Sequence, residues 1–240
     1  KILFVFLSWL SLLLYLIKGA ENSFDIGEIL KYDAYFSNIN AAEGSLKIFG
    51  VEEINGLKTY HVQFSAKTKG ITNRIFPIND VIDLWLDKSQ LLPLRVKSSI
   101  KEGQFKKNEE IYFYQQDGYA TKNKQKINIE GEVHSPYSLF YYFRNQNLDN
   151  YEPQEINILK GNQLETIKIE IEKNIKVSVP AGDYNCIKVI PTKLEGRKFK
   201  NNAEMEIYFS EDENYYPVKI KIKLKFGSLI LKLKEIINWR

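Results

Sequence analysis

The chain contains very little cysteine and histidine, and this shortage limits the chemistry it can perform. Its 240 residues include one cysteine, Cys186, and two histidines, His61 and His134. A single cysteine cannot form an intrachain disulfide, and neither histidine has a second His or Cys at metal-ligand spacing. We therefore expect no metal or cofactor, and we expect structural or surface roles for both histidines. Cys186 lies in the strand-like stretch "YNCIKV", where alternation makes it a small buried residue.

The usual sequence signatures of catalysis are missing as well. The chain has no Gly-x-Ser-x-Gly elbow, phosphate-binding loop or dinucleotide-binding loop. The net charge of +4 does not by itself indicate binding to nucleic acid, and we expect no nucleic acid partner. These absences predict a non-catalytic protein with no catalytic residues to assign.

The sequence begins with a long apolar run, Ile2 to Ile17, between Lys1 and the polar "KGAEN". This pattern is typical of a signal peptide, and the run is short for a membrane span of about 20 residues. We expect residues 1–20 to be a signal peptide and residues 21–240 to be one β-rich domain in the periplasm. The alternative is an inner-membrane anchor formed by residues 2–17, and we expect membrane contact only through this segment, if it is not cleaved.

The remaining sequence favours β-strands joined by tight turns. Aromatic residues make up 13% of the chain. Hairpin turns are indicated at "INGL" (54–57), "QDGY" (116–119), "KGNQ" (160–163) and "FGSL" (226–229). The flanking stretches alternate, as in "VKIKIKLKF" (218–226), which sorts apolar and lysine residues onto opposite faces of a strand. The fold class predicted is all-β, with a strongly curved antiparallel sheet or incomplete barrel.

One segment, residues 135–145, predicts a short helix instead. Ser135 is a plausible N-cap, and Pro136 suits the first helical position. The expected apolar face consists of Leu139, Tyr142 and Phe143, with Arg144 near the end. On a curved sheet this helix would be either a plug that completes the core or a lid over a ligand site.

Two stretches of the chain resemble each other, which suggests pseudo-repeats at about 28–120 and 151–237. "IDLWLDKSQLLPLRVKS" begins at Ile82, and "MEIYFSEDENYYPVKIK" begins at Met205. Each has an aromatic residue at the end of an alternating run (Trp85 or Tyr208), an acidic turn, and a proline that starts the next strand (Pro93 or Pro217). Two repeated β-meanders could curl toward each other around a shared apolar interior.

Two groups of charged residues are candidates for function. Asp80, Asp83 and Asp87 could supply a carboxylate pair for carbohydrate hydrolysis, but alternation favours outward-facing side chains, with Asp83 opposite Arg95. The second group is a row of lysines, Lys219, Lys221, Lys223 and Lys225. It could meet anionic headgroups, or it could be a solvated face balanced by Glu204 and Glu206, with Glu206 opposite Lys219 or Lys221.

Several stretches together resemble a known family. They are "GEILKY" (27–32), "FPINDVIDLWLD" (76–87), "LLPLR" (91–95), "SPYSLFYYFR" (135–144), "VPAGDYNCIKV" (179–189) and "YPVKIKIKLKFGSLILKL" (216–233). In this order they are similar to exported bacterial proteins of domain-of-unknown-function family 3108 (DUF3108), and the Pro-Ala-Gly turn is the most specific piece. The resemblance implies an all-β protein of a Gram-negative envelope and carries over no catalytic residues.

Three functions remain open from the sequence. The first is binding of a lipid or other amphipathic molecule on a concave apolar face, with ligand-binding residues unknown. The second is a protein-interaction module in envelope assembly. The third is a hydrolase that uses Asp80 and Asp83. A continuous apolar cavity favours the first, and a cleft with two close carboxylates favours the third.

Overall fold

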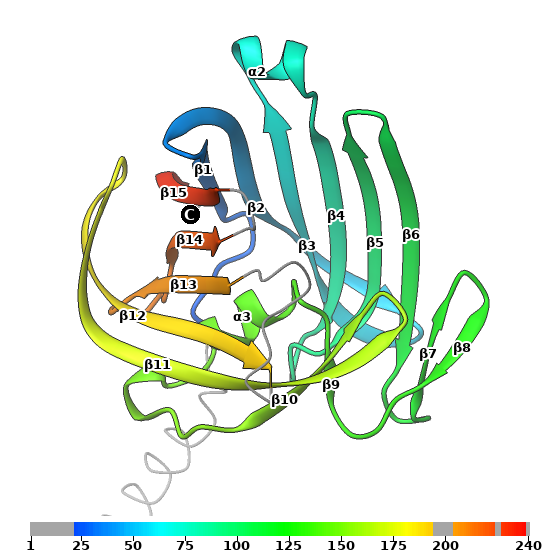
Figure 1. Ribbon diagram of the computed structural model, residues 1–240. Helices are drawn as coiled ribbons and strands as arrows, with labels where there is room; N and C mark the ends of the chain where they lie inside the picture. Colours follow the sequence, from blue (N-terminus) through cyan, green and yellow to red (C-terminus); the bar gives the residue numbers. More distant parts are fainter. Residues whose placement is uncertain (1–21, 194–203, 224–226, 239–240) are drawn as a thin grey trace, which may run out of the picture.

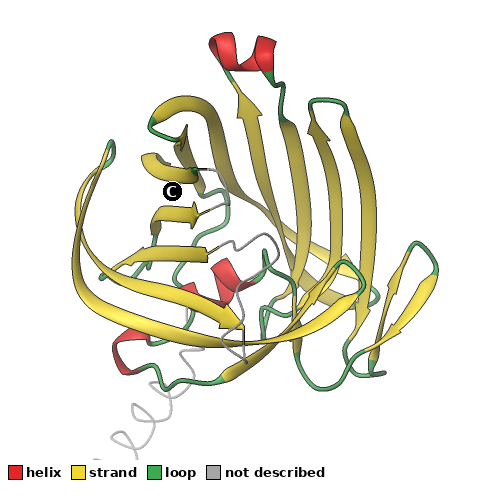
Figure 2. Ribbon diagram, viewed as in Figure 1, coloured by secondary structure: helices red, strands yellow, loops and turns green. Residues whose placement is uncertain are grey.

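A computed structural model describes residues 22–193, 204–223 and 227–238, which form one strongly curved, mainly antiparallel sheet (Figures 1 and 2). The all-β prediction is therefore confirmed. The predicted signal segment, residues 1–20, lies outside the described residues. In the part of the chain that the structure describes, no helix is both long enough and apolar enough to cross a bilayer.

The first half of the chain contributes eight strands and one short helix. They are β1 (Ile29–Phe36), β2 (Ile39–Ile54), β3 (Leu57–Thr68), α2 (Gly70–Ile75), β4 (Asn79–Asp87), β5 (Pro93–Glu102), β6 (Phe105–Tyr114), β7 (Tyr119–Lys122) and β8 (Gln125–Asn128). The second half contains β9 (Val133–His134), α3 (Leu139–Arg144), a 3₁₀ turn (Leu148–Asn150), β10 (Glu155–Lys160), β11 (Gln163–Val179), β12 (Gly182–Lys193), β13 (Glu204–Ser210), β14 (Pro217–Lys223) and β15 (Ser228–Ile237).

The first and last strands of the chain are neighbours at the middle of the sheet. The order across the sheet is β8-β7-β6-β5-β4-β3-β2-β1-β15-β14-β13-β12-β11-β10-β9. The two outer strands, β8 and β9, belong to the middle of the sequence. Near these edges the side-chain amide of Gln115 binds both backbone groups of Val133, at 2.8 and 3.2 Å.

Tight turns form where the sequence predicts them. Asn55 and Gly56 join β2 to β3 with φ values of 52° and 80°, and Gly161, with φ of 65°, begins the turn between β10 and β11. Such positive φ angles are needed at primed hairpin turns and favour Asn and Gly. The predicted 116–119 turn lies within the connection between Tyr114 of β6 and Tyr119 of β7. The turn predicted at 226–229 lies partly outside the described residues.

Similar local irregularities occur in the two stretches of the chain that resemble each other in sequence. The register between β4 and β5 shifts between Trp85 and Leu86, so that Leu86 pairs with Pro93. The register between β13 and β14 shifts between Tyr208 and Phe209, so that Phe209 pairs with Pro217. In both places a cation lies over the aromatic ring: the Arg95 guanidinium is 4.3 Å from the Trp85 ring, and the Lys219 ammonium is 4.7 Å from the Tyr208 ring.

The helical segments differ from the prediction. The structure has a second short helix, α2, between β3 and β4, and α3 begins at Leu139 rather than near Ser135. Ser135 caps the turn before α3 instead, because its Oγ accepts the backbone N–H of Ser138 at 3.0 Å while the Ser138 Oγ accepts that of Ser135 at 2.9 Å. This reciprocal pair satisfies two buried backbone donors in the manner of a capping box.

Helix α3 lies inside the curve of the sheet and is buried on nearly all sides (Figure 2). The expected single apolar face is wrong, because Phe140, Tyr141 and Arg144 are buried along with Leu139 and Phe143. A helix that is hydrophobic all round belongs in a core. The geometry is therefore that of a plug in the interior.

Candidate functional site

A cavity of about 250 Å³ lies on the concave side of the sheet, beside the segment that leads into α3. Strands from both halves of the chain line it. Its walls are mostly apolar and include Leu46, Phe64, Ile82, Phe140, Ile222 and Leu231. The prediction that the sheet has a concave apolar face agrees with this cavity.

A small side chain on β3 leaves space, and aromatic side chains from the α3 segment bound it. Ala66 lines the cavity and pairs with Gly44 of β2 on one side and with Asp80 of β4 on the other. The Phe64 ring lies 5.4 Å from that of Phe140 and 5.6 Å from that of Tyr137. The plug therefore fills part of the interior and also forms one wall of the cavity.

The polar end of the cavity is formed by Asp80 and Tyr137. The Asp80 Oδ1 accepts the backbone N–H of Lys101 at 2.8 Å. Burial raises the pKa of Tyr137 to about 12, with a further contribution from Asp80. Burial, and then the charge of Asp80, also raises the pKa of Glu102. Sequence reasoning missed both Tyr137 and Glu102, because neither is close to Asp80 along the chain.

The structure separates Asp80 from Asp83. Residues three apart on a strand point to opposite faces, so Asp80 lines the cavity and Asp83 lies on the outer face. The expectation that Asp80 points outward is therefore wrong. The predicted pairing of Asp83 with Arg95 is also wrong, because the register places Asp83 opposite Lys97. The two carboxylates do not form the close pair that carbohydrate hydrolysis would need.

The outer face carries a stacked column of side chains across four strands. The His61 ring stacks between the rings of Phe49, 4.8 Å away, and Trp85, 4.6 Å away, and Arg95 covers the other face of Trp85. The column follows the strand pairing, in which His61 lies opposite Trp85 and Trp85 lies opposite Arg95. Stacking across neighbouring strands is a common way to stabilise a sheet face.

Two carboxylates hold His61 in this column. Its Nδ1 lies 2.7 Å from Glu52 Oε1 and its Nε2 lies 3.1 Å from Asp83 Oδ1. Carboxylates only accept hydrogen bonds, so each ring nitrogen is used as a donor when both contacts form. Glu52 also accepts the indole N–H of Trp85 at 2.7 Å, which is the main reason that its pKa is lowered. The site therefore leaves no ring nitrogen of His61 open toward a substrate.

The other two candidates from the sequence, His134 and Cys186, are buried. His134 lies 3.3 Å from the Ser138 Oγ, and burial lowers its pKa to about 4. Burial raises the pKa of Cys186 to about 12, which keeps the sulfur a thiol and a poor nucleophile. Among the described residues, no group of three His, Cys, Asp or Glu side chains could hold a metal ion.

The lysine row on β14 is tied to its neighbours in the sheet. Lys221 lies opposite Glu206, as one of the two predicted pairings has it, and forms an ion pair with it at 3.0 Å. Lys219 lies over the Tyr208 ring, and burial lowers the pKa of Lys219. Lys225 and the Glu204 side chain fall outside the described part of the chain.

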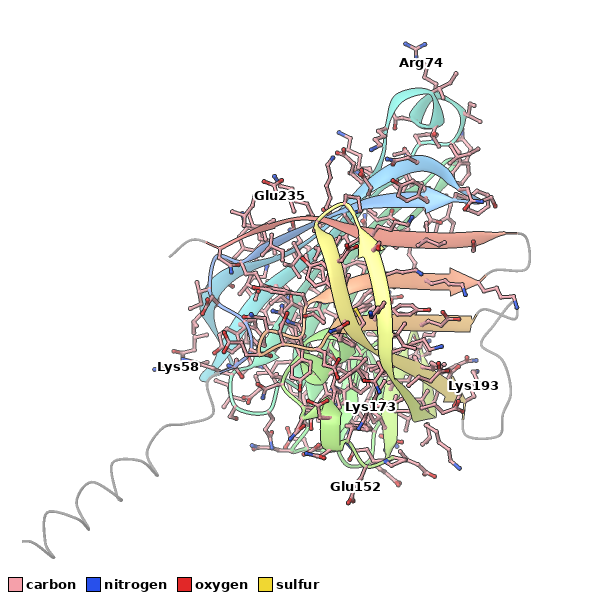
Figure 3. All side chains as sticks on the ribbon, turned by 90° about the vertical axis from the view of Figure 1, so that its left-hand side faces the viewer. Lys58, Arg74, Glu152, Lys173, Lys193 and Glu235 are labelled. Carbon is pink, nitrogen blue, oxygen red and sulfur yellow. The ribbon has the colours of Figure 1, made fainter. Side chains whose placement is uncertain are left out.

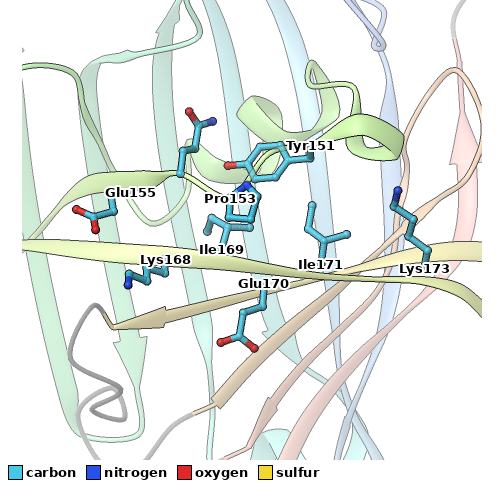
Figure 4. Close-up of a pocket in the computed structure, with 9 residues that line it drawn as sticks. Tyr151, Pro153, Glu155, Lys168, Ile169, Glu170, Ile171 and Lys173 are labelled. Carbon is cyan, nitrogen blue, oxygen red and sulfur yellow. The ribbon is translucent and has the colours of Figure 1, made fainter.

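A second hollow, an open groove of about 660 Å³, follows an exposed edge of β11 (Figure 4). Strand β10 pairs with β11 only up to Lys168, and among the described residues no strand pairs with the remainder of β11 on that side. The groove is lined there by Tyr151, Pro153, Glu155, Glu170 and Lys173. It combines an unpaired strand edge with charges of both signs.

A buried ion pair anchors the plug that shapes the cavity. Arg144, at the end of α3, donates two hydrogen bonds to the carboxylate of Glu28, at 2.5 and 2.8 Å. Both side chains are almost entirely shielded from water, with 1% and 3% exposed. Sequence reasoning placed Arg144 near the end of a helix but did not find this partner. The one sequence signal for this ion pair is that Arg144 and Glu28 both lie in stretches that resemble the DUF3108 family.

One comparison with a solved structure supports the fold. The chain is similar to a beta-barrel-like protein of domain of unknown function DUF1849 from Brucella abortus, at 9% identity and a TM-score of 0.56, over 90% of this chain and 98% of that one. It is also similar to a DUF1089 family protein from Pseudomonas aeruginosa, at 9% identity and a TM-score of 0.45, over 74% and 88% of the two chains. No curated protein matches the sequence.

The sequence itself identifies the family. The profile of the family described as "Protein of unknown function (DUF3108)" matches residues 31–234, which include every residue that lines the cavity and the whole of the plug. The chain belongs to the DUF3108 family.

Proposed function

We propose that this protein binds the hydrocarbon part of an amphipathic envelope molecule in the cavity beside α3. The observation that carries the proposal is the cavity: its walls are mostly apolar, and Asp80 and Tyr137 supply polar groups that lie near each other. Mostly hydrophobic walls with a few placed polar groups are typical of small-molecule sites. Asp80 and Tyr137 would fix the polar end of the ligand, and the walls would take its chain.

The size of the cavity limits the ligand. A volume of about 250 Å³ is slightly below the range of ~300–1,000 Å³ found for sites that enclose a drug-sized ligand. It therefore suits a short alkyl chain, or one segment of a longer chain that continues outside. Burying six to eight methylene groups would contribute about 5–6 kcal/mol, at ~0.8 kcal/mol for each group.

The proposed setting is the cell envelope, and the proposed role is carriage or sensing rather than catalysis. The apolar segment at residues 2–17 supports export. The separation of Asp80 from Asp83, and the engagement of both His61 nitrogens by carboxylates, support a non-catalytic role.

Filling the cavity tests the proposal. Ala66 lines the cavity, so Ala66→Phe should occupy it and reduce the binding of an apolar fluorescent probe at least tenfold. Thr121→Phe is the matched control, because Thr121 pairs with Tyr112 and does not line the cavity. Circular dichroism would confirm that both variants are folded. Equal probe binding by wild type and Ala66→Phe would contradict the proposal.

The groove along β11 favours a second function, an interaction module for another envelope protein. An extended peptide could add to the strand edge beyond Lys168 and contact Tyr151 and Lys173 in the groove. A photo-crosslinking residue at Lys173 should then give protein adducts in cells, and one at Lys58, which Figure 3 shows elsewhere on the molecule, should not. Equal labelling at the two sites would remove this candidate.

A further inference from the structure

Two loops at one end of the sheet form an exposed apolar tip. It consists of Ile71 and Ile75 of α2, of Phe76 directly after this helix, and of Phe105 at the start of β6. These four side chains are 73%, 76%, 50% and 56% exposed. Helix α2 has no buried residue, and it projects beyond the strands in Figure 1. Large side chains grouped and exposed in this way mark an interaction surface.

The tip is held in place by specific contacts. The Phe76 ring lies against Gly103, where an added Cβ would be 2.9 Å from the ring. The Gly103 N–H donates to the Pro77 carbonyl at 2.7 Å, which ties the two loops together. At the base of α2, the Thr68 hydroxyl donates to Asn73 at 3.0 Å and accepts the Ile78 N–H at 2.8 Å. These contacts fix the backbone that carries the exposed apolar side chains.

Cations surround the apolar tip. Arg74 lies on α2 and points away from the rest of the molecule in Figure 3. Lys101 and Lys106 face each other across β5 and β6. Like charges directly opposite each other destabilise a sheet, so the pairing of these two lysines does not contribute to the stability of the β5–β6 hairpin. Glu102 is the acid next to Lys101, and burial, followed by the charge of Asp80, raises its pKa.

We propose that this tip docks the protein onto an anionic phospholipid bilayer. Ile71, Ile75, Phe76 and Phe105 would enter the interface between headgroups and acyl chains, while the cations would meet the headgroups. Membrane binding of this kind depends on buried apolar area together with attraction to anionic lipid. This contact is additional to the one expected from residues 2–17.

The position of the tip relates it to the cavity. Ala66 and Asp80 both line the cavity. Ala66 lies two residues before the end of β3, and Asp80 lies one residue after the start of β4. Helix α2 connects these two strands. A protein docked through α2 would therefore hold this part of its cavity toward the bilayer. The docking itself does not depend on the proposed ligand, and the two are tested separately.

A local reporter tests docking in the full chain without interference from the N-terminal apolar segment. Ile75→Cys would be labelled with an environment-sensitive dye, since Cys186 is buried and its thiol has a pKa of about 12. Vesicles containing phosphatidylglycerol should shift the emission to shorter wavelength. A label on Leu164→Cys, an exposed position near the start of β11, should not respond. We expect each cation lost to weaken partitioning into these vesicles about fivefold. A triple variant with Arg74→Gln, Lys101→Gln and Lys106→Gln should therefore partition about a hundredfold more weakly.

Three results would overturn the proposal. One is the same shift with pure phosphatidylcholine, which would show that the cations have no part. Another is a shift that grows with protein concentration in the absence of vesicles, which would identify a second copy of the chain as the partner of the tip. The third is no shift with either vesicle. Probe binding measured without vesicles reports on the cavity alone, so failure of docking would leave the proposed ligand site standing.

Discussion

Arg144 at the end of α3 and Glu28 just before β1 form a bidentate ion pair in the interior, although 116 positions separate them in the chain. The guanidinium also donates to the backbone carbonyls of Ser23, at 2.8 Å, and Asn214, at 3.1 Å. Burial by itself would lower the pKa of Arg144, but the hydrogen bonds and charge of Glu28 raise it. Arg144 therefore stays ionised, and its contacts tie the plug to the segment before the first strand and to the second half of the sheet.

Removing one partner of this pair should be costly. Glu28→Gln leaves the Arg144 charge buried without a counter-charge, so we expect a loss of about 3–5 kcal/mol in the free energy of unfolding, measured by urea denaturation. The double variant Glu28→Gln with Arg144→Met should lose less than Glu28→Gln alone. Glu235→Gln is the control, because Glu235 forms an exposed pair with Lys31 and should lose at most ~1 kcal/mol. A loss below ~1 kcal/mol for Glu28→Gln would contradict this account.

Acid should destabilise the protein through His134. Its pKa is about 4 in the folded chain, against an ordinary value of 6.5. Between these values the unfolded chain binds a proton that the folded chain does not, so stability falls as the pH is lowered through this window. The full effect is about 3 kcal/mol. Urea denaturation between pH 7 and pH 4 should show a smaller loss for His134→Gln than for wild type, and parallel curves would refute the assignment.

Truncation of the plug should weaken the core. Phe143 is fully buried, and its ring lies 5.2 Å from that of Tyr142 and 6.2 Å from that of Phe209. Phe143→Ala should therefore lower the free energy of unfolding by about 3–5 kcal/mol. Phe105→Ala changes an exposed aromatic residue and should cost no more than ~0.5 kcal/mol. Similar melting temperatures for the two variants would show that α3 is a loose lid.

The outer column should contribute to stability and not to ligand binding. Asp83 accepts hydrogen bonds from His61 at 3.1 Å and from Gln63 at 2.8 Å. Asp83→Asn keeps one acceptor but loses the charge, so we expect a loss of about 1 kcal/mol by thermal melting and unchanged binding of the apolar probe. Asp117→Asn, at an exposed turn, is the control for stability. A weaker affinity for the probe in folded Asp83→Asn would show that the column and the cavity are coupled.

The sequence predicted the curved sheet because turns and alternation are local signals. Asn55 and Gly56 require positive φ angles, and the alternation of Val218 to Lys223 assigns each side chain to a face. Such signals do not say which strands meet across the sheet. The pairing of Asp83 with Lys97 rather than Arg95 depends on the register shift after Trp85, which residue counting could not anticipate.

The candidate site was less predictable than the fold. The cavity is formed by side chains from both halves and from the segment before α3, and its polar end joins Asp80 to Tyr137, 57 positions later. The sequence placed Arg144 near a helix end but did not reveal that the helix is enclosed. Helix α2 was missed because its six residues contain no apolar face directed at a core.

The pairing of β1 with β15 has a consequence for how the chain acquires its structure. Nearly every other pair of neighbouring strands is joined by a short connection and can form as soon as both strands are available, whereas Lys31 and Glu235 on these two strands are 204 positions apart. During synthesis or translocation the hydrogen-bonding edge of β1 must therefore wait for the last strand to emerge. Closure of this seam is the step with the largest loop entropy, so we expect it to limit the rate of folding. Until then, the half-formed sheet exposes the edge of β1, which lies at the centre of the sheet in the finished protein. This exposed edge can pair with the wrong strand.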